Sequence, residues 1–532
     1  ILYHMKEKIL IIWAGPAGLT LWFELLSRAP DAYEIIIVDK DIIVWGLAQT
    51  YNHKGNRIDI GGHRFFSKNK RVMDRWFSQM PLQGEWASDY KQLGIQSEVK
   101  TGGPDPDKED LVMLARRRLS RIFWDRKFFD YPLSITRDTL KKFGFVDLFL
   151  CGWSYMTAKL KKYDMSNLEG FYKSRFGTRL YHRFFDAYTF KVWGTQPSQI
   201  SSAWWAQRVK GLNLAKAVRD YFKKIIIWDK QSTNTETSLI GKFYYPKLGP
   251  GQMREIVSEK IRQMGGTILL ETEFLESHIG LKDGKTIIDS VSYSQKGEVK
   301  SFSPDLVIST APIKFLLNTM KWADLNIQSL GNTLEYRDFI TVWILADKLL
   351  VSNTSNYQTI DNIIPDNRIY IHDEGTTVGR IQIFNNRSPY MVADPKNIWI
   401  GLEYFCAKGD EIWNKSDEDM IQFAVDELIK MELLDMNDLL DGVVRRMENT
   451  YPCYFGEGYE QFDSLKKYLD GVDNLFCIWR NGAHRYNNQD HSMLSAMMLA
   501  DMLIDNTIDR SVLWNVNTEE EYHEGVSDKS DK

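Results

Sequence analysis

The chain has 532 residues, more than one hydrophobic core usually serves, so about two or three structural domains are expected. Hydrophobic residues make up 43% and charged residues 26%, a balance typical of soluble globular proteins. The net charge of −4 gives no electrostatic reason to expect a nucleic acid as partner. No apolar run approaches the roughly 20 residues that span a bilayer, so the protein is predicted to be cytoplasmic, without an integral membrane segment.

The N-terminal stretch 8–39 has the pattern of a dinucleotide-binding unit. It predicts a buried strand at 9–12, a turn with Gly15 and Gly18, a helix at 17–28 and a second strand at 34–38, followed by Asp39. Asp39 lies 21 residues after Gly18, about where an acid binds the ribose of a dinucleotide. Trp13 replaces the first glycine of the expected G-x-G-x-x-G pattern. An indole is the least suitable side chain there, because the turn is tight and a pyrophosphate must approach it closely.

Further along the chain, Gly61 and Gly62 in NRIDIGGH suit a loop that lies along a phosphate chain or a flat cofactor ring. The region from about 111 to 230 has helical periodicity. Within it, the arginine-rich stretch 115–133 is interpreted as an amphipathic surface helix, with a membrane-surface or anionic-ligand contact as the alternative. Further strands are predicted at 243–245, 267–275, 286–293, 305–310, 338–346, 368–373 and 397–404, and helices at 417–433 and 493–504.

The four cysteines, Cys151, Cys406, Cys453 and Cys477, are scattered without the spacing of metal ligands. They are therefore interpreted as reduced thiols, and no metal site is expected.

Four motifs carry a resemblance to a known family. They are IDIGGH (58–63), YTFKVWGTQPSQISSAWWAQRVKG (188–211), TYPCY (450–454) and RYNNQDHS (485–492). Together with the N-terminal unit they resemble the flavin-dependent superfamily of amine oxidases, protoporphyrinogen oxidase and UDP-galactopyranose mutase, and they are most similar to the mutase branch.

The resemblance implies an α/β fold: a Rossmann-like FAD-binding domain built from discontinuous segments, with an inserted mixed α+β substrate domain. The implied division assigns 5–100, 236–325 and 466–510 to the FAD-binding domain, 101–235 to a helical cap region, 326–465 to the substrate domain and 511–532 to a tail.

The resemblance also implies roles for single residues. Asp39 would bond the adenosine ribose, Gly15 and Gly18 would admit the pyrophosphate to a helix N-terminus, and Phe274 would lie against adenine. Gly61, Gly62 and His63 would lie against the isoalloxazine, with His63 as a catalytic candidate. Arg208 would clamp a substrate diphosphate, and Tyr451 would add a hydroxyl to the same phosphates. The second flavin face and the ribityl chain would be lined by Arg480, Asn488, Gln489 and Asp490.

Tryptophan recurs where the relatives have glycine. Trp45 precedes Gly46 in the second loop expected at the cofactor, and Trp479 precedes Arg480 at the flavin. Trp343 also falls where a small residue is usual. Three explanations compete: a flavin-less pseudoenzyme, a site rebuilt around another ligand, and UGA codons that mean glycine but were translated as tryptophan.

We favour the codon explanation, because the change affects one residue type at glycine positions while Gly15, Gly61, Gly62 and His63 stand. Against it, the 35 glycines are close to the roughly 37 expected from average usage. UGG codons at 13, 45, 343 and 479 would contradict it.

The predicted function is an FAD-dependent enzyme similar to UDP-galactopyranose mutase, with NAD(P)H as a candidate reductant and a nucleotide sugar or similar anionic small molecule as substrate. Reduced flavin would then attack the anomeric carbon, as the resemblance implies. The alternatives are a net oxidation by hydride transfer to FAD, as in amine oxidases, and a flavin-less binding protein if Trp13, Trp45 and Trp479 are real.

Overall fold

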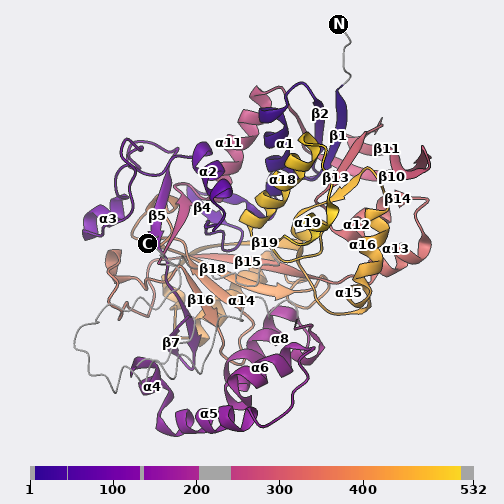
Figure 1. The fold of residues 1–532 in the computed structure, drawn as a ribbon. Coiled ribbons are helices and arrows are strands. Elements are labelled where there is room, and N and C mark those ends of the chain that lie inside the picture. The colour runs from indigo at the N-terminus through magenta and orange to yellow at the C-terminus, as the bar shows by residue number, and fades with distance from the viewer. Residues whose placement is uncertain (1–5, 45, 132–136, 203–240, 517–532) are drawn as a thin grey trace, which may run out of the picture.

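The computed structural model describes residues 6–44, 46–131, 137–202 and 241–516. Its first sheet has five parallel strands in the order β20-β13-β1-β2-β9 (Figure 1). The strands come from widely separated parts of the chain: β1 (Glu7–Ile12), β2 (Tyr33–Val38), β9 (Thr267–Leu269), β13 (Leu306–Ser309) and β20 (Leu475–Cys477). This is the predicted Rossmann-like sheet of discontinuous segments, and the fold-class prediction is confirmed.

Strand β1 divides its side chains between two cores, which explains why its apolar run is continuous. Ile9 and Ile11 face a core formed with α1 (Pro16–Arg28), whereas Leu10 and Ile12 face a core formed with other elements. A parallel strand that is covered on both faces needs an apolar residue at every position. The first core also takes residues of α2 (Lys70–Gln79), α11 (Pro250–Gln263) and α18 (Gln489–Ile504), and α1 and α18 lie side by side.

The opposite face of the parallel sheet is covered by a smaller sheet and three helices. The smaller sheet has the order β12-β11-β10-β14. Its strands are β10 (Thr272–Lys282), β11 (Lys285–Gln295), β12 (Glu298–Phe302) and β14 (Met320–Lys321), and the helices are α12 (Ile313–Thr319), α13 (Leu325–Asn332) and α16 (Phe462–Asp470).

A second large sheet has seven strands in the order β19-β15-β18-β17-β16-β6-β7 and is antiparallel except between β16 and β6. Its strands are β6 (Ser120–Trp124), β7 (Lys127–Asp130), β15 (Tyr336–Ala346), β16 (Arg368–Ile371), β17 (Arg380–Ile383), β18 (Ile398–Cys406) and β19 (Leu439–Pro452). Helix α14 (Asp417–Lys430) packs on one face through Met420, Ala424 and Leu428. The other face turns toward the Rossmann-like part of the molecule and carries Phe339, Trp343 and Phe405.

The remaining elements are short strands and helices. The short strands are β3 (Thr50–His53), β4 (Asn56–Asp59), β5 (Met113–Arg117) and β8 (Lys242–Pro246). The remaining α-helices are α3 (Ser88–Leu93), α4 (Arg137–Phe143), α5 (Phe145–Ala158), α6 (Leu168–Phe176), α7 (Thr178–Tyr181), α8 (Ala187–Trp193), α15 (Glu457–Glu460), α17 (Trp479–Gly482) and α19 (Arg510–Trp514). Of these, α4, α5, α6 and α8 form a helical region at the foot of Figure 1.

The predicted surface helix at 115–133 is wrong. This stretch forms the end of β5 and then the hairpin β6–β7, whose turn residues Asp125 and Arg126 both have positive φ. The arginines that suggested an exposed helical face are instead strand residues, and two of them are buried. Arg116 is paired with Asp89 and Arg121 with Asp366, so carboxylates distant in the sequence make their burial possible.

Most other predicted elements are confirmed. The strand predicted at 267–275 is divided into β9 and β10 because Glu271 has a φ of 49° between them. The last helix begins at Gln489, earlier than the predicted 493, because Asn488 and His491 form a capping box there. The domain boundaries stay a prediction.

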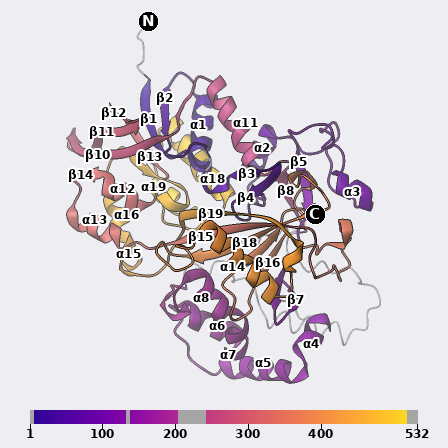
Figure 2. The same cartoon turned by 180° about the vertical axis from the view of Figure 1, so that it is seen from behind.

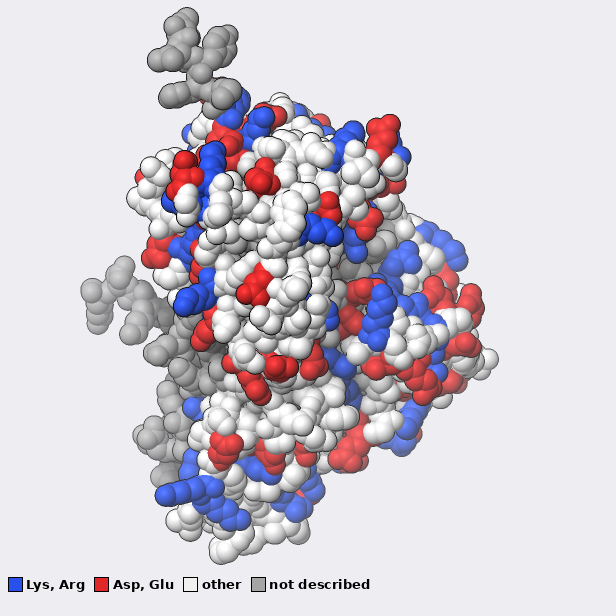
Figure 3. Space-filling view, turned by 90° about the vertical axis from the view of Figure 1, so that its right-hand side faces the viewer, with Lys and Arg blue, Asp and Glu red and all other residues white. Residues whose placement is uncertain are grey.

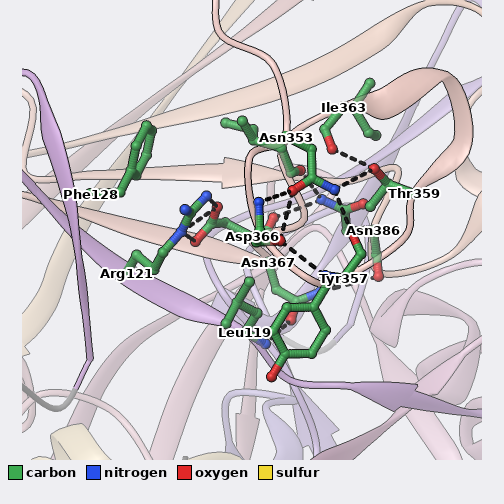
Figure 4. A network of polar contacts seen from close by, with 12 residues as sticks. Leu119, Arg121, Phe128, Asn353, Tyr357, Thr359, Ile363, Asp366, Asn367 and Asn386 are labelled. Atoms are coloured by element: carbon green, nitrogen blue, oxygen red, sulfur yellow. Dashed lines mark hydrogen bonds and ion pairs between the residues drawn. The ribbon is translucent and has the colours of Figure 1, made fainter. Parts of the chain in front are cut away.

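Replacing Asp366 by alanine is expected to lower the free energy of unfolding by about 3–5 kcal/mol, because it leaves the Arg121 guanidinium buried without its charge partner. Arg121 donates to both carboxylate oxygens from Nε, at 3.0 and 3.1 Å, and the pair lies inside the polar network of Figure 4. Urea unfolding followed by circular dichroism measures the change. The matched control is Lys127→Ala, which breaks the exposed pair with Asp125 at 2.8 Å and should cost less than about 1 kcal/mol. Equal effects of the two substitutions would contradict the argument.

Candidate cofactor and substrate site

The turn between β1 and α1 is fixed by contacts that require small residues. A Cβ added to Gly18 would lie 2.6 Å from the carbonyl oxygen of Trp13, so only glycine lets the helix approach the strand this closely. Gly15 is the N-cap of α1, and Pro16 occupies the first helical position. The N-terminus of α1 is therefore aimed out of the turn, where its unpaired N–H groups and dipole favour an anion.

Asp39 follows β2 and holds this turn from the side. Its carboxylate accepts hydrogen bonds from the backbone N–H of Ala14 at 2.7 Å and of Asp41 at 2.9 Å. Burial raises the pKa of Asp39 to about 6, against these two bonds, which lower it. Each carboxylate oxygen keeps a second lone pair, so the carboxylate can still accept a bond from a ribose hydroxyl, the role predicted for it.

Trp13 and Trp479 have the backbone conformation of glycine. Their φ angles are 75° and 76°, in the left-handed region that a bulky side chain rarely adopts. Trp343 does not share this feature, since it lies in the regular strand β15 between Val443 and Gly401. Trp322, which the sequence did not single out, has a φ of 62° and is 74% exposed. Trp45 lies outside the described residues.

The indole of Trp479 lies in front of the glycine-containing turn. Its Cη2 atom is 3.8 Å from a Cβ added to Gly15 and 4.0 Å from one added to Gly46. The indole of Trp13 packs against Phe315, with ring centroids 5.6 Å apart, and Phe315 in turn faces Phe274 at 6.4 Å. The main chain of the site therefore fits a dinucleotide, whereas the side chain of Trp479 fills the space that a pyrophosphate would need.

The loop with Gly61, Gly62 and His63 lies against arginines from the second sheet. Gly61 has a φ of 77°, and a side chain on Gly62 would overlap the guanidinium of Arg368, which donates to the Gly62 carbonyl at 3.0 Å. Burial, followed by the positive charges of three guanidinium groups, lowers the pKa of His63 to about 3. These groups belong to Arg480, Arg387 and Arg368. His63 is therefore neutral at physiological pH, and its Nδ1 is buried without a hydrogen-bond partner.

The facing strands add a carboxylate and a fourth arginine. Arg380 on β17 is 3.3 Å from Glu403 on β18 and donates from Nε to the hydroxyl of Tyr188 at 3.2 Å. A Cβ on Gly61 would lie 3.8 Å from the Oε1 atom of Glu403, which places this pair beside the glycine loop. Arg368, Arg380, Arg387 and Glu403 are site residues that the sequence did not predict. The sequence signal that could have identified two of them is an arginine among apolar strand residues: Arg380 in GRIQIF and Arg368 in RIYI.

Tyr451 and Arg480, which the sequence did predict, are in contact. The Arg480 guanidinium lies 5.4 Å from the ring centroid of Tyr451 and 4.8 Å from that of Tyr486, and the two rings stack. Arg480 also donates to the carbonyl oxygens of Thr450 and Asn487. It therefore joins the end of β19 to the loop before α18 and orients both tyrosines.

The start of α18 completes the site. Asn488 caps the helix, and the Nε2 atom of Gln489 is buried without a hydrogen-bond partner. Burial raises the pKa of Asp490, whose carboxylate accepts a hydrogen bond from Ser67 on the segment after the glycine loop. The structure thus links the turn, the glycine loop and the start of α18 through Trp479, Arg480 and Asp490. Arg208 lies outside the described residues.

The comparisons with known proteins agree with this layout. Residues 11–79 match the family model for an NAD(P)-binding Rossmann-like domain. A crystal structure of reduced UDP-galactopyranose mutase aligns with 96% of this chain and 99% of its own, at 19% identity and a TM-score of 0.73. The chain shares the fold of this mutase structure.

Two further solved structures extend the likeness. A protein from Exiguobacterium sp. 255-15 with the provisional name protoporphyrinogen oxidase aligns with 94% of this chain and 100% of its own, at 13% identity and a TM-score of 0.64. A putrescine oxidase with redesigned cofactor binding covers 94% of this chain and 99% of its own, at 12% identity and a TM-score of 0.55. The fold predicted from the motifs is therefore confirmed across nearly the whole chain.

His63 is expected to remain neutral throughout the physiological pH range. Its NMR ring resonance, assigned with the His63→Gln variant, should not titrate between about pH 5 and 8, because its pKa is about 3 when folded and about 6.5 when unfolded. The unfolded state then binds the extra proton, so the stability contributed by His63 is complete above about pH 6.5 and is lost as the pH falls toward 3. A titration midpoint near 6.5 for this resonance would show that His63 is not buried among the three arginines.

Proposed function

We propose that this chain, with glycine at positions 13 and 479, is an FAD-dependent enzyme that acts on a nucleotide sugar or a similar anionic small molecule. NAD(P)H is the proposed reductant. The observation that carries the proposal is the glycine backbone conformation at positions 13 and 479, at a turn whose main chain is already shaped for a dinucleotide. The indole of Trp479 does not fit a pyrophosphate, so the proposal requires glycine at this position.

The proposed cofactor contacts follow the order of the site. The α1 N-terminus with Gly15 and Gly18 would hold the pyrophosphate, Asp39 the ribose, and Phe274 the adenine end. Gly61 and Gly62 would lie against the ring system, since both lack the side chain that would keep a flat ring at a distance. Arg480, Asn488, Gln489 and Asp490 would line its other side, and the unpartnered donor of Gln489 supports that role.

The charges beside His63 favour an anionic substrate over an apolar one. Arg368 and Arg380 come from adjacent strands, and a guanidinium can bind a phosphate through two parallel hydrogen bonds. His63, kept neutral, could donate or accept a single hydrogen bond there without repelling a sugar hydroxyl. Tyr451, oriented by Arg480, and Arg208 are the other two proposed catalytic residues.

Two alternative functions are separated by specific observations. A net oxidation by hydride transfer, as in an amine-oxidase-like enzyme, would require an apolar pocket without paired arginines. The three arginines beside His63 make the pocket positively charged and therefore disfavour this alternative. A flavin-less binding protein requires that Trp13 and Trp479 are the residues of the working protein. Their positive φ angles speak against that, because such strain costs about 1–3 kcal/mol per residue.

The double substitution Trp13→Gly and Trp479→Gly is expected to convert a colourless protein into one that retains stoichiometric FAD. It relieves the strained backbone and clears the space in front of α1. The visible absorption band of flavin after gel filtration measures retention. Trp322→Gly is the matched control: it relieves the same kind of backbone strain at φ 62° but lies on an exposed surface, so it should not change flavin retention. A folded, colourless double variant would support the flavin-less alternative.

In that flavin-retaining protein, Arg208→Ala is expected to weaken UDP-hexose binding by about 2–5 kcal/mol if the guanidinium pairs with the diphosphate. Titration calorimetry with the reduced protein measures it, and Arg208→Lys should recover only part of the loss because lysine cannot form the bidentate contact. Arg117→Ala, on the exposed end of β5, is the control and should leave the affinity unchanged. Unchanged affinity in Arg208→Ala would remove Arg208 from the site.

A further inference from the structure

Helix α5 presents an apolar face to the outside. Five large apolar side chains at or just beyond this helix are more exposed than buried: Val146 at 70%, Phe149 at 64%, Trp153 at 58%, Met156 at 58% and Leu160 at 88%. They follow one another at intervals of three and four residues, which places them along one side of a helix.

The polar contacts of α5 are on its inner side. Asp147 is 2.6 Å from Arg179 and 2.9 Å from Arg183, and the hydroxyl of Ser154 accepts a hydrogen bond from the Arg179 N–H at 3.0 Å. An ordinary surface helix has the opposite arrangement, with apolar residues inward and charges outward. Because the ion pairs fix the rotation of α5, the apolar side cannot turn toward the core.

The exposed side of α5 differs from the other exposed apolar residues of the described chain. Elsewhere, Leu281 on β10 is 80% exposed and Leu325 on α13 is 76% exposed. Leu325 has one exposed apolar neighbour in the sequence, Trp322 at 74%, whereas the side of α5 carries a row of five. Single exposed apolar residues are normal on protein surfaces and need no explanation. A contiguous group marks an interaction surface.

The charge around α5 indicates the kind of partner. Residues 141–162 contain five lysines and one acid, Asp147, in a chain whose net charge is −4. The lysines are Lys141, Lys142, Lys159, Lys161 and Lys162. Asp147 is paired with two arginines and Lys142 with Asp138, so Lys141 lies at one end of the apolar side and Lys159, Lys161 and Lys162 lie at the other. Such a basic surface repels a second copy of the same surface and attracts an anionic partner.

The position of α5 suits a flat partner. In Figures 1 and 2 this helix runs along the foot of the molecule, below α6 and α8, at the end opposite the parallel sheet. In Figure 3, white side chains at the foot have a group of blue ones beside them. A helix at such an extremity can meet a planar surface without a clash from neighbouring elements.

We propose that α5 seats the protein on the surface of an anionic lipid membrane. The helix lies in the plane of the membrane, with Phe149, Met156 and Leu160 at the boundary between headgroups and acyl chains and the lysines on the phosphates. It does not cross the bilayer: α5 has 14 residues, and none of the described helices has the length and apolarity to span one. A single lysine near an anionic surface contributes only weak attraction, so several are needed beside a short apolar side.

The test is flotation of the full chain with phosphatidylcholine vesicles that contain or lack phosphatidylglycerol. The protein should float with the anionic vesicles and remain at the bottom with the neutral ones. Phe149→Ser combined with Met156→Ser and Leu160→Ser should reduce the floated fraction at least tenfold. Lys161→Glu with Lys162→Glu should lower it severalfold, and high salt should have the same effect.

The matched control is Leu281→Ser with Leu325→Ser, which removes equally exposed apolar side chains elsewhere and should float like the parent. Thermal unfolding of every variant checks that the fold is kept. Flotation of the folded triple variant at parental levels would overturn the proposal. So would a parent that fails to float but forms a dimer in sedimentation velocity that the triple variant loses, since the occupant would then be a second copy.

Discussion

The hydrogen bond from the Ala14 N–H to the Asp39 carboxylate, at 2.7 Å, is the interaction on which the rest of the candidate site depends. It joins the turn after β1 to the end of β2, and the backbone N–H of Trp13 donates to the Val38 carbonyl beside it. These two bonds hold residue 13 in its left-handed conformation and direct α1 away from the sheet. The low exposure that raises the pKa of Asp39 is therefore a consequence of its structural role, because a carboxylate that faced solvent could not hold the turn.

The same constraint explains why the fold tolerates tryptophan at two strained positions. The backbone at 13 and 479 is set by strands β1 and β20, which are paired with β13 on either side. Pairing along the strands outweighs the roughly 1–3 kcal/mol that a bulky residue costs in this region. The left-handed backbone conformation thus indicates that positions 13 and 479 are adapted to glycine, although the sequence has tryptophan there. A site adapted to a different ligand would have no reason to keep glycine geometry at both strand ends.

How much could be predicted from the sequence depended on whether the determining contacts were local. The strand, turn and helix at 8–39 follow from neighbouring residues, and they were predicted nearly to the residue. The hairpin at 120–130 was mistaken for a helix because Arg121 is buried through Asp366, which is 245 residues away. Two of the three arginines around His63, Arg368 and Arg387, are not recognisable from the sequence for the same reason: they meet His63 only when the second sheet is assembled against the glycine loop. A charged residue in a strand is recognisable as buried only when its partner is known.

The electrostatics of the candidate site follow from this assembly. Three guanidinium groups around one imidazole would repel one another in an isolated loop, and it is the fold that keeps them together. Arg387 is tied to the carbonyl of Gly61 and Arg480 to those of Thr450 and Asn487, so each is anchored by backbone oxygens. Two carboxylates lie beside the four arginines: Glu403 is 3.3 Å from Arg380, and Asp59 is 3.4 Å from Arg387. The site therefore carries more positive charge than its own acids neutralise, and an anionic ligand would supply the balance.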